Sequence, residues 1–217
     1  MRTLHFYFDY LSPYAYLAWT RMNALAKRHD ATVEIVPVLL AGLLAVHGQK
    51  GPAEIPSKRL YTFKHIVRLA HGLGIPVAMP PSHPFNPLLA LRLSCLPYDP
   101  VVRRALVDVM FREVWAGGRG VEDPAVVRDL LAAYGLDPDA EIARATSDEN
   151  KARLRANTDD AIRRGVFGVP SIRVDDEVFW GFDSLPHLEA FLDGRDPVTP
   201  EFLAQLNAVQ ASAVRIP

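Results

Sequence analysis

The feature that most constrains the fold of this chain is a short strand joined to a helix by a Ser-Pro turn. Apolar side chains alternate with His, Tyr and Asp over residues 3–9, which predicts a β-strand. Apolar side chains then recur every three or four residues from 15 to 26, which predicts one buried helix face. Ser12 occupies the N-cap position and Pro13 the N1 position, where a missing N–H costs nothing. The Ser12 hydroxyl is therefore expected at the positive end of a helix dipole, which stabilises an anion such as a thiolate.

Composition and charge are those of an ordinary globular protein. The 217 residues can bury a sizeable core, since 49% are hydrophobic and 23% are charged. A formal net charge of −1 gives no electrostatic reason to bind nucleic acid or an anionic membrane, and no apolar stretch is long enough to span a bilayer. The first residues lack a basic segment followed by an apolar one, so we expect no signal peptide and a cytoplasmic location.

The middle of the chain is predominantly helical. A second strand is expected over residues 33–40, and a β-α-β unit of this size normally forms a parallel pair of strands. A short helical turn and a loop are expected over 41–57. Several later helices begin with Asp-Pro, a cap followed by proline at N1. The expected helices cover residues 58–71, 87–95, 99–115, 123–134, 138–145 and 147–164.

Strand signals return near the C-terminal end. Residues 171–174 and 178–180 flank Asp-Asp-Glu, which predicts a hairpin. Asp183 and Ser184 are expected to cap a short helix over 185–192, and one more weak helix follows Pro200. Strands from both ends of the chain can form one sheet, with the helical block inserted between them. The residues expected in the core include Trp19, Trp115, Trp180 and the single cysteine, Cys95.

This order of elements resembles the thioredoxin fold of the DsbA superfamily. The stretch 168–171, Gly-Val-Pro-Ser, leads into the hairpin as the loop before the third strand does in that fold, so the resemblance implies that Pro170 is cis and faces the Ser-Pro turn. DsbA proteins have Cys-x-x-Cys where this chain has Ser12-Pro13-Tyr14-Ala15. A single cysteine excludes an internal disulfide, and thiol–disulfide exchange has no nucleophile in the position that it needs.

The stretch 8–16, Phe-Asp-Tyr-Leu-Ser-Pro-Tyr-Ala-Tyr, is similar to that of 2-hydroxychromene-2-carboxylate isomerases and of the related kappa-class glutathione transferases. Further similar stretches are residues 51–56, Lys58 with Tyr61, 83–87, 165–170 and 179–183. The resemblance covers essentially the whole chain. It implies a single DsbA-like domain over 1–217, with a thioredoxin-like part at about 1–45 and 165–217 and a helical insertion at about 58–164.

The resemblance also implies a glutathione site. Ser12 would donate a hydrogen bond to the glutathione sulfur and hold it as the thiolate, whose parent thiol has a pKa of about 8.5 when free. The backbone of Val169, next to Pro170, would pair with the cysteinyl part of glutathione. The γ-glutamyl end would be received by Phe182, Asp183 and Ser184, with helix N–H groups for the carboxylate and the Asp183 side chain for the ammonium.

The expected second substrate is an unsaturated or aromatic carboxylate. The resemblance implies that the 41–57 loop lines its site and that Lys58 pairs with the carboxylate as a point charge. The substrate-binding candidates are His47, Gln49, Lys58 and Asn86. Gln49 stands where the isomerases usually have Asn, Phe182 where a polar residue is common, and no lysine occurs in 39–46, where the isomerases tend to have one. His47 and His83 are either acid–base groups or ordinary loop histidines.

Three functions stay open at this point. The leading hypothesis is a glutathione-dependent isomerase, in which Ser12 activates the cofactor and the thiolate adds reversibly to the substrate. The second is a kappa-like glutathione transferase. The third is a non-catalytic thioredoxin-fold binding protein, in which Ser12 is only a helix cap. Relatives are often homodimers, so a homodimer is a further expectation. We expect no metal, because no His, Cys and carboxylate cluster has ligand spacing.

Overall fold

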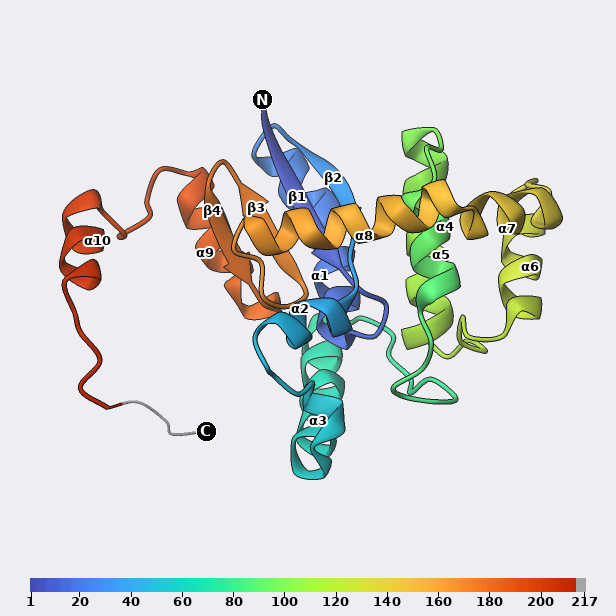
Figure 1. The fold of residues 1–217 in the computed structure, drawn as a ribbon, viewed down its shortest axis with the longest axis horizontal. Helices are drawn as coiled ribbons and strands as arrows, with labels where there is room; N and C mark the ends of the chain where they lie inside the picture. Colours follow the sequence, from blue (N-terminus) through green and yellow to red (C-terminus); the bar gives the residue numbers. More distant parts are fainter. Residues whose placement is uncertain (214–217) are drawn as a thin grey trace.

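The computed structural model describes residues 1–213, which contain one mixed four-stranded sheet (Figure 1). The strands are β1 (Arg2–Phe8), β2 (Ala31–Pro37), β3 (Ser171–Val174) and β4 (Glu177–Trp180), in the spatial order β2-β1-β3-β4. β1 and β2 are parallel, as the β-α-β pattern predicts, while β3 is antiparallel to both β1 and β4. The end of the predicted thioredoxin-like part, residues 214–217, lies outside the described residues.

β1 is buried on both faces because helices cover both sides of the sheet. The covering helices are α1 (Pro13–Arg28) and α9 (Leu185–Leu192) on one side, and α2 (Leu40–Val46) and α8 (Asp148–Arg163) on the other. In Figure 1, α8 crosses in front of the strands. Phe6 and Phe8 pack on the α1 side, whereas Tyr7 packs with Leu43 of α2 and Ala161 of α8. Residues on both faces of this strand are therefore inside the protein.

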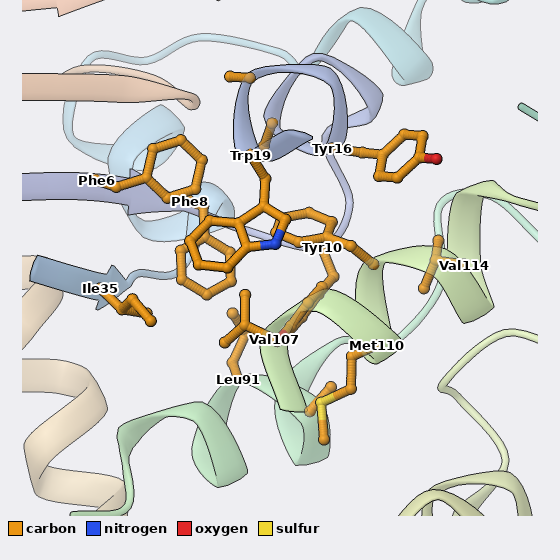
Figure 2. Close-up of a cluster of buried hydrophobic side chains, with 14 of the residues drawn as sticks. Phe6, Phe8, Tyr10, Tyr16, Trp19, Ile35, Leu91, Val107, Met110 and Val114 are labelled. Carbon is orange, nitrogen blue, oxygen red and sulfur yellow. The ribbon is translucent and has the colours of Figure 1, made fainter. Parts of the chain in front are cut away.

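An aromatic cluster joins the sheet to the helical part of the chain (Figure 2). Phe111 of α5 (Pro100–Trp115) contacts three aromatic rings. They belong to Phe8 of β1, to Tyr10 in the turn that follows, and to Trp19 of α1. The ring centroids of Tyr10 and Phe111 lie 4.7 Å apart, and those of Phe8 and Tyr10 lie 5.2 Å apart in an edge-on arrangement. Figure 2 shows side chains of α5 reaching the same cluster. The first β-α unit and the helical insertion thus share one core.

The helical insertion follows its proline and aspartate signals. Its helices are α3 (Pro56–Leu73), α4 (Leu88–Cys95), α5, α6 (Pro124–Ala133), α7 (Pro138–Thr146) and α8, preceded by the 3₁₀ turn η1 (Pro52–Glu54). The side chains of Asp99, Asp123 and Asp137 accept backbone N–H groups at the starts of α5, α6 and α7. The expected α/β thioredoxin-like fold with a central helical insertion is confirmed.

Two predicted boundaries are wrong. The second strand was expected to reach residue 40, but β2 ends at Pro37, which has no N–H for the sheet, and Leu40 is the first residue of α2. The Asp9 carboxylate accepts the Leu40 N–H at 3.0 Å, which favours the helix start. α3 begins at Pro56 rather than at Lys58, because proline suits the first turn. α3 ends at Gly74, whose φ of 65° is left-handed.

The core predictions hold for three residues and fail for one. Trp19, Trp115 and Cys95 are buried, whereas Trp180 is 52% exposed. Trp180 lies on β4, the edge strand, and its ring packs on that of Phe167 with centroids 5.1 Å apart. It covers Gly168 so closely that a Cβ there would lie 2.6 Å from the indole nitrogen. Burial raises the pKa of the Cys95 thiol to about 12.

The remaining element, α10 (Pro200–Asn207), buries none of its residues and lies to one side of the sheet (Figure 1). It is the weak helix expected after Pro200. Over residues 1–213, no helix combines the length and the apolar character that crossing a membrane requires. The same residues bring no three His, Cys, Asp or Glu side chains together in an arrangement that would hold a metal ion.

Candidate active site

Ser12 lies in the turn between β1 and α1, with 6% of its surface exposed. Its backbone is extended, as an N-cap requires, and its hydroxyl oxygen accepts the Ala15 N–H at 3.2 Å. The same hydroxyl donates to the backbone oxygen of Val169 at 3.3 Å. The first turn of α1 contains no acidic residue of its own. The hydroxyl is a cap and, at the same time, a donor beside an anion-stabilising helix end.

The loop before β3 faces this turn. The Val169–Pro170 peptide bond is cis, as the resemblance implies, and the Val169 side chain is nearly buried. Within residues 1–213 the backbone N–H of Val169 has no hydrogen-bond partner. Gly181 N–H donates to the Pro170 oxygen at 2.9 Å, which ties this loop to the segment after β4. The Ser-Pro turn and the cis-proline loop therefore meet at one point, with a free donor beside it.

The 3₁₀ turn η2 (Phe182–Ser184) follows Gly181 and packs against α1. Asp183 is exposed, while Phe182 and Ser184 are partly buried. Burial raises the pKa of Tyr14, and the nearby Tyr61 and Asp183 groups raise it further. Ser184 occupies the N-cap position of α9 as expected, but its side chain does not cap the helix, because its hydroxyl donates to the Trp180 oxygen instead.

Asp9 is a member of the site that the sequence did not indicate. Its side chain is 1% exposed, and its two carboxylate oxygens accept the N–H groups of Leu11 and Leu40, each at 3.0 Å. Asp9 thus joins the Ser12 turn to the start of α2. Burial raises its pKa to about 6, against the lowering effect of the two hydrogen bonds. The alternation in β1 placed Asp9 on the face away from the aromatic cluster, and only the cover of α2 and α8 buries it.

The far side of the Ser12 turn is formed by histidines of the helical insertion. His83 Nε2 donates to the backbone oxygen of Leu11 at 2.9 Å, and burial lowers the pKa of His83, so the ring is neutral near pH 7. His65 Nδ1 lies 2.8 Å from the Tyr14 hydroxyl. His83 is therefore hydrogen-bonded to the backbone of the turn at Leu11, the residue before Ser12. The peptide bond between His83 and Pro84 is cis.

The predicted substrate-binding residues are less concentrated. His47, Gln49, Lys58 and Asn86 are all exposed. His47 ends α2, and Lys58 lies in the first turn of α3. Asn86 shapes the turn before α4, because its Oδ1 accepts the Leu88 N–H at 3.1 Å. Among residues 1–213, no hydrogen bond joins these four side chains to Ser12 or Val169. Their role toward a substrate stays a prediction.

The family match and the relatives by sequence agree with one another. Residues 3–193 match the family described as DSBA-like thioredoxin domain. The 2-hydroxychromene-2-carboxylate isomerase of Sphingobium xenophagum is 30% identical over 88% of this chain and 98% of its own. A kappa 2 glutathione transferase of Caenorhabditis elegans is 26% identical over 88% of this chain and 92% of its own.

A solved structure of a 2-hydroxychromene-2-carboxylate isomerase superposes with a TM-score of 0.82 at 28% identity, covering 95% of this chain and 98% of the other. The relatives by sequence are isomerases and transferases, and this chain is an enzyme of that kind. A family match over residues 3–193 and 30% identity over 88% of the chain agree with the fold. The chain belongs to the DSBA-like thioredoxin-domain family and, within it, to the 2-hydroxychromene-2-carboxylate isomerases.

Proposed function

We propose that this protein is a glutathione-dependent isomerase of the 2-hydroxychromene-2-carboxylate isomerase type, acting in the cytoplasm on an unsaturated aromatic carboxylate. The observation that carries the proposal is the position of the Ser12 hydroxyl, between the first N–H groups of α1 and the backbone of Val169 before a cis proline. A donor and a helix dipole at one point stabilise a thiolate, and each pKa unit by which they lower the thiol is worth about 1.4 kcal/mol.

The residues around Ser12 fit the rest of glutathione. The unpartnered N–H of Val169 is available to the cysteinyl carbonyl, beside the cis proline. The exposed carboxylate of Asp183 forms no ion pair within the described residues and is available to the γ-glutamyl ammonium. The partly buried Phe182 and Ser184 complete η2 beside α1. Val169, Pro170 and η2 would thus hold the peptide, and Ser12 its sulfur.

Bound glutathione would supply a thiolate that adds reversibly to the conjugated system of the substrate and leaves after bond rotation. Ser12 would donate its hydrogen bond to the sulfur instead of to the Val169 oxygen, and would not itself attack. Asp9 and His83 would hold the turn in place from its two sides through the backbone of Leu11. The 41–57 loop with His47 and Gln49, together with Lys58 and Asn86, would border the second substrate.

A kappa-like glutathione transferase is the second candidate, supported by the kappa-class relatives and by the absence of a lysine in 39–46. It uses the same glutathione site and differs in the second substrate, which would be an electrophile that stays joined to the sulfur. A non-catalytic binding protein would need neither the free Val169 N–H nor the free Asp183 carboxylate.

The test is calorimetric titration of reduced glutathione into the wild type and the Ser12→Ala variant, with the ultraviolet absorbance of the thiolate followed against pH. The wild type is expected to bind and to lower the thiol pKa, and Ser12→Ala to lose that lowering. Ser147→Ala is the matched control, because Ser147 caps α8 through the Asn150 N–H and lies outside the site. Both variants lose a cap worth about 1 kcal/mol.

Equal thiol pKa values in the wild type and Ser12→Ala complexes would remove Ser12 from the mechanism. No glutathione binding by the wild type would exclude both the isomerase and the transferase. Isomerisation of 2-hydroxychromene-2-carboxylate by the wild type with glutathione, without accumulation of a conjugate, would favour the isomerase over the transferase.

A further inference from the structure

An open pocket of about 310 Å³ lies at the N-terminal end of α3. Its walls are Ala53 of η1 and four residues on one face of α3: Pro56, Arg59, Leu60 and Phe63. The same face continues one turn later into Ile66, which is buried in the core. The face of α3 that packs on the core therefore extends beyond it and lines this pocket. There it presents the Phe63 ring, the aliphatic side chains of Pro56 and Leu60, and the Arg59 cation.

Arg59 is the only charged side chain in the pocket wall. Its guanidinium carbon lies 5.7 Å from the centroid of the Phe63 ring, and it forms no ion pair with any residue in 1–213. Another pocket, of about 250 Å³, differs: it is lined by Arg119 together with Glu122 and Asp123, and Arg119 pairs with Asp129 and Glu113. Arg59 keeps its five donors available beside an aromatic ring.

The pocket adjoins the Ser12 turn through two side chains. The Phe63 ring meets His83 edge-on, with centroids 5.3 Å apart. His83 Nε2 in turn donates to the Leu11 oxygen, next to Ser12. On the neighbouring face of α3, Tyr61 stacks on His65, which contacts the Tyr14 hydroxyl in the first turn of α1. Phe63 of the pocket wall is therefore linked to the Ser12 turn through the His83 ring.

We propose that Arg59 binds the carboxylate of the aromatic substrate, while Phe63 and Leu60 contact its ring system. The proposal rests on the proposed function and names the cation that anchors the second substrate. A planar guanidinium matches a carboxylate with two parallel hydrogen bonds, which an ammonium does not. Lys58, predicted for this role from the sequence, lies one position away on the helix and does not line the pocket. Arg59 is therefore the cation that lines this pocket, and Lys58 is tested beside it.

The test compares Arg59→Gln and Arg59→Lys with Lys58→Gln and with Arg68→Gln, an exposed arginine on the same helix that does not line the pocket. Cinnamate and its neutral amide, cinnamamide, are titrated into each protein by calorimetry, with and without reduced glutathione. Steady-state isomerisation of 2-hydroxychromene-2-carboxylate gives KM and kcat for each variant.

Arg59→Gln is expected to weaken cinnamate binding about tenfold or more, to leave cinnamamide binding unchanged, and to raise KM with little change in kcat. Arg59→Lys should recover part of the loss, and Arg68→Gln should behave as the wild type. Unchanged cinnamate binding by Arg59→Gln, equal losses for cinnamate and cinnamamide, or the loss appearing in Lys58→Gln instead would overturn the proposal. Glutathione affinity is measured separately in each protein. Absence of glutathione binding in the wild type contradicts the proposed function, whereas the cinnamate comparison decides on Arg59.

Discussion

Asp9 connects two segments that the sequence keeps 31 positions apart. One carboxylate oxygen holds the Leu11 N–H in the Ser12 turn and the other holds the Leu40 N–H at the start of α2. The side chain is fully buried, and burial raises its pKa to about 6. A residue that stabilises the turn through hydrogen bonds thus also introduces a charge into the interior near pH 7.

The stability of the protein is expected to depend on the ionisation of Asp9. The pKa of Asp9 is 3.8 in the unfolded chain and about 6 in the folded protein, so the folded state keeps a proton on Asp9 that the unfolded chain has already released. The free energy of unfolding therefore falls as pH rises from about 4 to above 6. The difference between the two pKa values corresponds to about 3 kcal/mol in the free energy of unfolding. Relative to the wild type, Asp9→Asn should therefore become more stable by about this amount between pH 4 and pH 7, measured by urea unfolding at each pH.

Asp123→Asn is the control for Asp9→Asn, because Asp123 is an exposed helix cap. Its stability profile should run parallel to that of the wild type. If the profile of Asp9→Asn also runs parallel, Asp9 does not change its proton affinity on folding.

Single residues of the site differed in how much the sequence revealed. Ser12 was found because its Ser-Pro signal is local: a cap, a proline and a helix face follow one another. Asp9 was missed because its burial depends on α2 and α8, which lie far along the chain and cover the second face of β1. Trp180 was misplaced for the converse reason, since nothing local indicates that β4 is the edge of the sheet.

At the scale of elements, the turn from β4 into η2 depends on a glycine. Gly181 has φ 93° and ψ 158°, which favours glycine, and a Cβ there would lie 2.4 Å from Asp183 Oδ1. Its N–H also ties η2 to the Pro170 oxygen. Any side chain at this position must displace either the backbone or the Asp183 carboxylate.

Gly181→Ala is expected to weaken glutathione binding about tenfold, because η2 and Asp183 shift away from α1, and to destabilise the fold by about 1–3 kcal/mol. Calorimetry and thermal unfolding measure the two effects. Gly72→Ala is the matched control: Gly72 lies inside α3 with open space around it, so alanine there should stabilise by up to about 1 kcal/mol. Wild-type glutathione affinity in Gly181→Ala would contradict the assignment of η2 to the glutathione site.

Helix starts were predicted more accurately than strand ends. The Asp-Pro caps of α5, α6 and α7 act within one helical turn, so these helix starts can be predicted from neighbouring residues alone. The start of α2 after β2 is favoured by the Asp9 carboxylate, which lies just after β1 and accepts the Leu40 N–H, and the apolar run 36–40 gives no indication of that contact. The residues on the substrate side stay predictions, and the sequence could not show that Arg59 rather than Lys58 lines a pocket, because that depends on how α3 packs.

At the scale of the whole molecule, the helical insertion is hydrogen-bonded to the thioredoxin-like part at three buried or partly buried points. Trp115 Nε1 of α5 donates to the Tyr10 oxygen at 2.9 Å. Arg103 donates to the Ile35 oxygen at 2.8 Å, and Asn157 of α8 to the Pro37 oxygen at 3.2 Å. We propose on these grounds that the two parts named from the sequence form one cooperative domain.

The protein is therefore expected to unfold in a single transition. Far-ultraviolet circular dichroism, which is dominated by the helical insertion, and tryptophan fluorescence should give the same urea midpoint. Trp115→Phe should lower both midpoints together, because it leaves the buried Tyr10 oxygen without its donor, at about 1–3 kcal/mol. Separate midpoints, or a loss confined to one signal, would show that the insertion unfolds on its own.

The buried state of Cys95 has a consequence for chemistry at the surface. It is the only sulfhydryl in the chain, and with a pKa of about 12 it stays protonated and shielded at neutral pH. Thiol-specific alkylating reagents should therefore find no reactive thiol in the native protein. In the proposed glutathione complex, a thiolate absorbance at neutral pH would therefore come from glutathione and not from the protein.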